Sequence, residues 1–455
     1  MLKIYEIIYK IAKIFGFKFV FFIRYLLYRK AVLEPENLFL LNNSELAFLK
    51  QLFNIKKKDF KKIDLNNINI GFVGAFSHNF SFPSGLFKNI RKNSFFSNKN
   101  IFIYEFIYDN NNMSKIASEN NLEYKMIDLN INLKGAYSRI FKDTYDYNYL
   151  SRTIKDDKID LLIFSYESTH RYTSIKLLNT LSCLCIGFNW GNTFIAHPLM
   201  KIQSKIQTPP CWKVENNKLL HSSGKIIDNY IFIKDLFFYD KRDIVVKNNV
   251  KEEFENIIFV HGRLSKLYQI GYLDIISTLL INNKDLKFIF MGYDDQNSLS
   301  KIYDYFTKNK LIDRIEYSGS YSQAKNKDGI IIDKNWEKCK FYLKNSALYL
   351  NPFPKGSGSS RIEAFASGLP VIDYEIDFMD CSKRSEKAYI LEPLIKKFGT
   401  GYTKEEYLNL AQKTLNDIQY RKNIINEQYK IVNDFCDEYV FWNKIENTIK
   451  KYHNV

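Results

Sequence analysis

The sequence predicts an α/β protein with two similar lobes. Short apolar runs alternate with polar or helical stretches from residue 68 to 190, and a second series of the same kind runs from 256 to 376. A strand–helix–strand alternation at this spacing is typical of parallel sheets covered by helices. The length of 455 residues supports the division, because it exceeds one ordinary domain and suggests two or three.

The first series contains four expected strands, each leading into small or polar residues. They lie at 68–76, 100–108, 158–166 and 182–190. A helical segment at 172–181 separates the last two. Residues 198–250 are less regular and include the turn-like stretches "TPPCW" and "HSSGKIIDN", so we interpret them as an insertion followed by an interdomain linker.

The second series has the same rhythm and ends in a long helical region. Strands are expected at 256–264, 287–293, 314–321, 347–353 and 370–376, and helices at 268–283, 335–346 and 361–367. Residues 403–450 read as helical throughout. The expected organisation is therefore an N-terminal helical region (1–66), an N-terminal lobe (67–245), a C-terminal lobe (246–430) and a C-terminal helix (431–455) that crosses back to the first lobe.

The N-terminal 30 residues are basic and aromatic, with Glu6 as their one acid. They contain no uncharged apolar stretch of the length that spans a bilayer, and no small-residue cleavage site follows them. One interpretation is an amphipathic helix lying at the inner face of the cytoplasmic membrane. The other is a helix packed on the main domain with its basic face in water. The sequence leaves both open.

Composition limits the partners. The formal net charge is +16, which reflects either compositional bias or an anionic partner such as a phosphorylated substrate or an acidic membrane surface. No nucleic-acid motif is present. The six cysteines form no CxxC and no zinc-type spacing with histidine, which favours a reduced, cytoplasmic protein without a metal site.

A loop rich in glycine and serine carries the strongest functional signal. It lies in "NPFPKGSGSSRIEAFASGLPVI", between an expected strand and an expected helix. A helix N-terminus offers unsatisfied N–H groups and a positive dipole end, so an anion is expected there. Glu363 is placed in the first helical turn, where its carboxylate can accept from the hydroxyls of a ribose. The expected donor-binding residues are Lys355, Gly356, Ser357, Gly358, Ser359, Ser360 and Glu363.

This segment resembles the nucleotide-sugar loop of GT-B glycosyltransferases, closest to the group of O-GlcNAc transferases and bacterial cytoplasmic N-glucosyltransferases. The resemblance implies two Rossmann-like lobes facing a central cleft. It also implies diphosphate-binding hydroxyls at Ser359 and Ser360 and a ribose-binding acid at Glu363. The tolerable matches cover roughly residues 68–200 and 256–375; residues 1–66, where O-GlcNAc transferases carry helical repeats, are not covered.

A basic loop supports the resemblance. "IIFVHGRLSKL" is a strand followed by Arg263 and Lys266, which match the cations that neutralise the donor diphosphate in GT-B enzymes. His261, at the end of this strand, is a further candidate for contact with the donor phosphate. One departure concerns Lys355, which stands where the large retaining family has the first of its two glutamates. This departure favours transfer with inversion.

An inverting transfer needs a general base to accept the acceptor proton. His78 follows the first expected strand and is the preferred candidate, because histidine titrates near neutral pH. His170, His197 and Glu167 follow later strands and are the other acceptor-side candidates.

The expected function is therefore glycosyl transfer from a nucleotide sugar, most simply a UDP-sugar, without a metal cofactor. The acceptor is expected to be a lipid-linked or cell-surface glycan. Alternatives are a cytoplasmic protein O- or N-glycosyltransferase and a non-catalytic protein that binds a nucleotide sugar or a polyanion.

Overall fold

The computed structural model divides the chain into two compact units. The first unit is Met1–Phe238 together with Asp437–Val455, and the second unit is Tyr239–Cys436. The structure describes residues 63–74, 76, 84–106, 112–127, 147–166, 177–189, 199, 202–205, 212–215, 218–221, 226–227, 231–234, 254–294, 297–321, 333–353, 359–374 and 399–453. The expected N-terminal helix of residues 1–30 lies outside these ranges.

The first unit is built on a parallel sheet in the order β10-β6-β5-β4-β1-β2-β3. Its strands are β1 (Asn69–Gly74), β2 (Asn100–Phe106), β3 (Glu123–Ile127), β4 (Leu161–Tyr166), β5 (Leu184–Asn189), β6 (Ile202–Lys205) and β10 (Ile231–Lys234). The four strands expected from the first series are confirmed. They were recognisable because a central parallel strand is covered on both faces and therefore reads as an apolar run.

Sequence patterning missed the strands at the two edges of this sheet. The strand β3 reads "EYKMI", and its first four residues are exposed or half-buried, so it lacks the apolar run of a central strand. The strands β6 and β10 lie in the segment interpreted as an insertion and linker. Between them lies the small antiparallel sheet of β7 (Trp212–Glu215), β8 (Lys218–His221) and β9 (Ile226–Ile227). The segment thus extends the sheet and carries a hairpin.

An aromatic core packs on the first sheet and includes the end of the chain. The helices of this unit are η2 (Ser84–Lys92), α4 (Asn112–Glu119), α6 (Tyr147–Asp156) and α15 (Glu438–His453). Trp442 of α15 is fully buried, and its ring lies 5.9 Å from Phe72 of β1 and 5.0 Å from Phe96, between centroids. Its indole N–H donates to the carbonyl of Leu86 at 3.3 Å. The last helix is therefore part of the core of the first unit.

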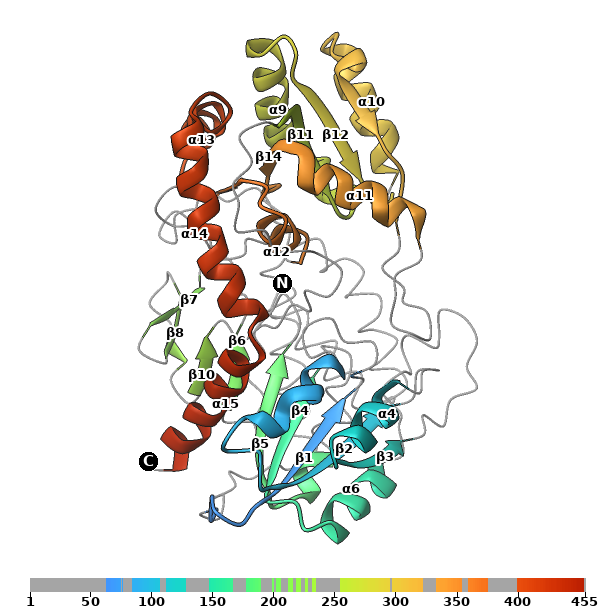
Figure 1. Ribbon diagram of the computed structural model, residues 1–455, viewed down its shortest axis with the longest axis vertical. Helices are drawn as coiled ribbons and strands as arrows, with labels where there is room; N and C mark the ends of the chain where they lie inside the picture. The colour runs from blue at the N-terminus through green and yellow to red at the C-terminus, as the bar shows by residue number, and fades with distance from the viewer. Residues whose placement is uncertain are drawn as a thin grey trace, which may run out of the picture. The chain divides into compact units, whose positions relative to one another are not determined.

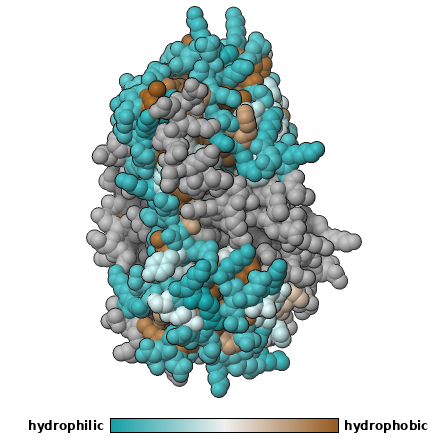
Figure 2. All heavy atoms as spheres, in the orientation of Figure 1, coloured by the Kyte–Doolittle hydropathy of each residue, from teal (hydrophilic) through white to brown (hydrophobic). Residues whose placement is uncertain are grey.

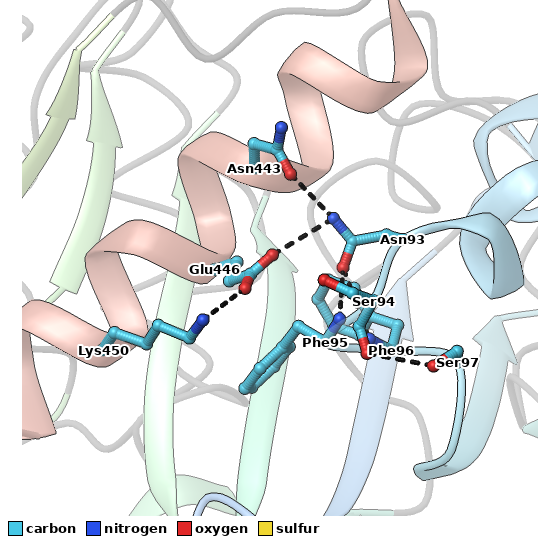
Figure 3. Close-up of polar contacts among 8 residues, drawn as sticks. All are labelled: Asn93, Ser94, Phe95, Phe96, Ser97, Asn443, Glu446 and Lys450. Atoms are coloured by element: carbon cyan, nitrogen blue, oxygen red, sulfur yellow. Dashed lines mark hydrogen bonds and ion pairs between the residues drawn. The ribbon is translucent and has the colours of Figure 1, made fainter.

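A polar network beside this core also binds α15 (Figure 3). The amide of buried Asn93 donates to Asn443 at 2.9 Å and to Glu446 at 3.2 Å, and its oxygen accepts from the backbone N–H of Phe95 at 2.9 Å. Glu446 is also paired with Lys450 at 2.6 Å. Each buried polar group in the network thus has a partner, as stability requires.

The second unit is built on a second parallel sheet, in the order β13-β12-β11-β14-β15-β16. The strands are β11 (Glu255–His261), β12 (Lys287–Met291), β13 (Ile315–Tyr317), β14 (Ser346–Leu350), β15 (Val371–Tyr374) and β16 (Thr400–Gly401). All five strands expected in the second series are present. Counted along the chain, the order is 3-2-1-4-5-6, the arrangement of a doubly wound dinucleotide-binding fold.

Helices cover the second sheet, and Figure 1 shows α9 and α11 against the strands β11 and β12. The helices are α8 (Leu264–Leu267), α9 (Ile270–Asn282), α10 (Ser298–Lys308), η4 (Ile312–Arg314), α11 (Lys334–Asn345), α12 (Ser359–Ala366), α13 (Lys404–Asn416) and α14 (Ile418–Cys436). The predicted α/β fold class is confirmed in both units.

The helical region expected as continuous at 403–450 is three helices. Asp417 and Asp437 stand at the two breaks, and each side chain accepts from a backbone N–H of the following helix, at 2.8 Å from Tyr420 and 2.7 Å from Tyr439. Aspartate competes for backbone donors in this way and favours helix starts over helix interiors. The second break coincides with the boundary between the units.

On the face shown in Figure 2, hydrophobic residues occur as small patches among hydrophilic ones. Exposed large apolar side chains such as Ile281, Tyr293 and Tyr439 are present, as on most protein surfaces. In the part of the chain that the structure describes, no helix is long and apolar enough to cross a membrane.

Candidate functional site

The order of the strands in the second unit indicates where a ligand would bind. In a doubly wound sheet the ligand site lies outside the carboxyl ends of the strands, where the strand order reverses. In this unit the reversal lies between the neighbouring strands β11 and β14. The segments that leave these two strands carry the basic loop with Arg263 and Lys266 and the glycine-serine loop. Two motifs far apart in sequence therefore follow neighbouring strands at one edge of one sheet.

The residues between β14 and the glycine-serine loop are held by aromatic contacts and hydrogen bonds. Phe353 stacks on Tyr374 with centroids 4.4 Å apart and meets Tyr407 edge-on at 5.2 Å. The hydroxyl of Tyr407 donates to the carbonyl of Asn351 at 2.9 Å, and that of Tyr272 donates to the carbonyl of Leu350, also at 2.9 Å. The "NPF" that opens the motif is thus held in an aromatic cluster.

A buried ion pair fixes the exit of the loop. Arg361 of α12 contacts Asp373 of β15 at 2.7 Å, and the side chains are 3% and 1% exposed. Asn351 donates to the other carboxylate oxygen of Asp373 at 2.8 Å. One buried aspartate therefore joins the residues on both sides of the loop, which sets the direction from which α12 approaches the sheet.

The helix α12 begins at Ser359, so its positive end faces the loop as expected. Lys355, Gly356, Ser357 and Gly358 lie outside the described residues. Ser360 is half-buried and shares a hydrogen bond with the hydroxyl of Tyr321, a residue that follows β13.

Glu363 lies deeper than expected. The sequence placed it in the first turn of the helix, but it is the fifth residue of α12 and only 2% exposed. Its carboxylate oxygen Oε2 lies 2.7 Å from Nε2 of His261, which is 0% exposed at the end of β11. The helix starts two residues earlier than the sequence suggested, and this turns Glu363 toward the sheet.

His261 is fully buried, and its surroundings favour the neutral imidazole. Burial lowers its pKa to about 3, because no water stabilises the imidazolium. Its Nε2 atom faces Glu363, and contact of His261 with a donor phosphate stays a prediction. Burial also raises the pKa of Tyr321 and that of the Cys339 thiol, and the negative charge of Glu363 adds to both effects.

Two opposed glycines shape the basic loop. Gly262 and Gly292 follow the neighbouring strands β11 and β12 with φ of 138° and 143°. A Cβ on Gly292 would lie 1.6 Å from the carbonyl oxygen of Gly262, so no other residue fits there. Arg263 follows as the exposed N-cap of α8, and Lys266 is half-buried in the same short helix. Both expected cations therefore follow the carboxyl end of β11, at the same edge of the sheet as the N-terminus of α12.

The acceptor-side candidates His78, Glu167, His170 and His197 lie outside the described residues. In sequence they follow β1, β4 and β5, and β1 and β4 flank the reversal of strand order in the first sheet. Among the described residues, this edge also carries Glu105, 3% exposed at the end of β2, which accepts from the hydroxyl of Tyr124 at 3.1 Å. Within the same residues, no group of three or more His, Cys, Asp and Glu forms a metal site.

Several residues of the site escaped the sequence analysis. They are Tyr272, Tyr321, Asn351, Phe353, Arg361, Asp373 and Tyr407. Asp373 gave a usable signal, because a lone carboxylate inside the apolar run "PVIDY" must find a buried partner. The aromatic residues gave none, since Phe and Tyr are frequent throughout this chain.

Comparison of the model with solved structures finds the same architecture, although no family model and no curated protein matches the sequence. A mutant of the O-GlcNAc transferase of Thermobaculum terrenum superposes with a TM-score of 0.59 at 12% identity, over 90% of this chain and 74% of that one. The lipopolysaccharide outer core galactosyltransferase WaaB, in its apo form, gives a TM-score of 0.51 at 14% identity, over 85% of this chain and all of that one.

A third structure is HepE of Anabaena in complex with UDP and glucose. It gives a TM-score of 0.50 at 10% identity, over 85% of this chain and 100% of HepE. The chain has the GT-B fold. The predicted resemblance is confirmed at the level of the fold, and the site described above lies in the C-terminal Rossmann-like unit of this GT-B protein.

Proposed function

We propose that this GT-B protein is a glycosyltransferase that uses a nucleotide-sugar donor. The observation that carries the proposal is the edge of the second sheet, where a helix N-terminus and two cationic residues follow neighbouring strands. The anchoring of the glycine-serine loop on both sides by buried contacts supports it, because a loop that binds an anion gains affinity when its ends are held in place. HepE, which has the same fold, binds UDP and glucose, and this supports a UDP-sugar donor.

The chemistry follows from the charge that appears on the leaving group. Transfer breaks the bond between the anomeric carbon and the diphosphate oxygen, and the diphosphate leaves with the bonding electron pair. Arg263, Lys266 and the N-terminus of α12 stabilise this growing negative charge. The acceptor hydroxyl forms the new bond and gives its proton to a general base, for which His78 is the first candidate and His170, His197 and Glu167 are the others. With Lys355 in place of a second glutamate, we propose inversion at the anomeric carbon.

We propose a lipid-linked or cell-surface glycan as the acceptor. The basic, aromatic N-terminus supports work at the inner face of the cytoplasmic membrane, and WaaB, with the same fold, acts on lipopolysaccharide. A protein acceptor is the second candidate, because the fold is shared with an O-GlcNAc transferase. Cell fractionation of the full chain and of a variant without residues 1–30 separates the two. Membrane association that depends on these residues supports the glycan acceptor.

The donor itself is tested by a thermal-shift screen of UDP-, GDP- and CMP-sugars, followed by assays of donor hydrolysis. A cognate donor at 100 times its Kd stabilises the folded chain by about 2.7 kcal/mol through mass action. We expect a UDP-sugar to shift the unfolding temperature and Lys266→Ala to weaken the shift. If no donor stabilises or is hydrolysed, and Lys266→Ala changes nothing in cells, the protein is not a glycosyltransferase.

A further inference from the structure

A buried pair links the two motifs at the edge of the second sheet. His261 and Glu363 are 102 residues apart in sequence and lie on different elements, yet their side chains meet at 2.7 Å with 0% and 2% exposure. Burying a titratable pair is costly, and apolar residues of similar volume often serve stability as well or better. The helix α12 already has a separate anchor to the sheet in Arg361 and Asp373. The pair therefore calls for a reason other than stability.

The direction of the hydrogen bond follows from the protonation states. Burial lowers the pKa of His261, which favours the neutral imidazole with a single N–H, and its Nε2 atom faces the Glu363 carboxylate, which accepts when it carries its charge. The imidazole therefore donates from Nε2 to Glu363, and Nδ1 carries the lone pair. Among the described residues no partner reaches Nδ1, which suits a lone pair better than a buried N–H.

The imidazole ring is held by aromatic neighbours. It stacks on Phe259 at 5.6 Å and on Tyr321 at 5.8 Å, and Tyr349 meets it edge-on at 5.8 Å. Tyr321 also shares a hydrogen bond with Ser360, one turn before Glu363 on α12. These three aromatic rings thus orient the imidazole of His261, and one of them, Tyr321, also contacts the helix that carries Glu363. A carboxylate held from one side in this way is restricted in its rotamer.

We propose that His261 is a positioning residue of the donor site, which holds the Glu363 carboxylate in the orientation that accepts from the ribose hydroxyls of the nucleotide. The proposal rests on the proposed function. It assigns His261 no proton transfer and no contact with the phosphates. It predicts instead that the recognition of the ribose depends on a residue that does not touch it.

Two substitutions separate the hydrogen bond from the packing. His261→Phe keeps an aromatic ring among the three aromatic neighbours but removes the donor, whereas His261→Gln places an amide N–H at a similar reach. We expect His261→Phe to raise the KM for the UDP-sugar about tenfold with a smaller change in kcat, and His261→Gln to stay within about threefold of the wild type, since hydrogen bonds to charged groups are stronger than those between neutral groups. The readout that a merely structural role would not move is the ratio of kcat/KM for the UDP-sugar to that for its 2′-deoxyribose analogue. This ratio should fall in His261→Phe and in Glu363→Gln but not in His261→Gln.

A measurement on the wild-type chain keeps the test decisive if His261→Phe does not fold. With ¹⁵N-labelled histidine, the Nε2–H resonance of His261, assigned by its loss in His261→Gln, should shift when UDP is added and shift less with 2′-deoxy-UDP. The role of His261 would be overturned if the wild type, His261→Phe and His261→Gln discriminated equally between the UDP-sugar and its 2′-deoxyribose analogue. It would also be overturned if the Nε2–H resonance did not shift when UDP binds. If Glu363→Gln binds the donor normally as well, or no donor binds to the wild type, the failure lies with the proposed function.

Discussion

The two units use the same strand order for different purposes. Around β1 in the first unit, the described core is a cluster of aromatic side chains that includes Phe72, Phe87 and Trp442. Around β14 in the second unit, the core contains the buried ion pair of Arg361 on α12 and Asp373 on β15.

The polar networks of the two units differ in the same sense. In the first unit, Asn93 and Glu446 are buried, but Lys450 at the end of the network is half exposed. In the second unit, both partners of the Arg361–Asp373 ion pair and both partners of the His261–Glu363 hydrogen bond are almost fully buried. Charges are retained at such depth where geometry matters more than stability. The buried charges of the second unit therefore join the segments on both sides of its glycine-serine loop. The polar network of the first unit instead attaches the C-terminal helix to that unit.

The largest expected effect comes from breaking the buried ion pair. Asp373→Ala leaves the Arg361 guanidinium buried without its carboxylate and should lower the free energy of unfolding by about 3–5 kcal/mol. Denaturant titration measures this, with exposed Asp313→Ala as a matched control that should change it by less than about 0.5 kcal/mol. A double variant, Arg361→Met with Asp373→Leu, should recover most of the loss. If Asp373→Ala is neutral, the pair does not anchor the loop.

In the first unit, the corresponding test is Trp442→Ala. Removing this fully buried indole leaves a cavity among Phe72, Phe87 and Phe96 and should cost about 3–5 kcal/mol of unfolding free energy. Donor affinity per folded molecule should stay unchanged, because Trp442 serves the first unit alone. Isothermal titration with the donor checks this. If Trp442→Ala weakens donor binding as much as Asp373→Ala does, the two units do not differ in the way proposed.

A catalytic cation should matter less for folding than for turnover. Lys266→Ala should lower kcat by about 10²–10³, which is the usual cost of removing one group that stabilises a developing negative charge. Steady-state transfer assays measure it. Lys287→Ala is the matched control, because this exposed lysine opens β12 at the opposite edge of the same sheet. Equal losses in both variants would show that overall charge, not position, is responsible.

The smallest effect over the measured range is a dependence of stability on pH, which amounts to about 2 kcal/mol between pH 6.5 and 5.0. His261 has a pKa of about 3 in the folded chain and 6.5 when unfolded, so below pH 6.5 the unfolded chain binds a proton that the folded chain does not. Stability should fall with decreasing pH through the window from 6.5 to about 3, by at most about 1.4 kcal/mol per pH unit. Denaturant titrations at pH 5.0 to 7.5 measure the slope. His261→Gln should lack this contribution, and identical slopes in the two proteins would contradict it.

Much of the fold could be predicted because the central strands carry their own signal. Strands such as β1, β11 and β14 are covered on both faces, so each is an apolar run bounded by polar residues. The same reasoning failed at the sheet edges, where β3 is partly exposed and β6 and β10 are short. It also failed at Asp417 and Asp437, since a helix break made by one side-chain cap differs little in sequence from a continuous helix.

The candidate site divides in the same way. The sequence by itself determined the loop, its place between a strand and a helix, and the cations of the basic loop, because these are local patterns of residue type and spacing. Only the tertiary structure decided that Glu363 points at His261 and that Arg361 and Asn351 share Asp373. Each of these is a contact between residues far apart in the chain, and such contacts depend on strand order and helix start, which local patterns do not encode.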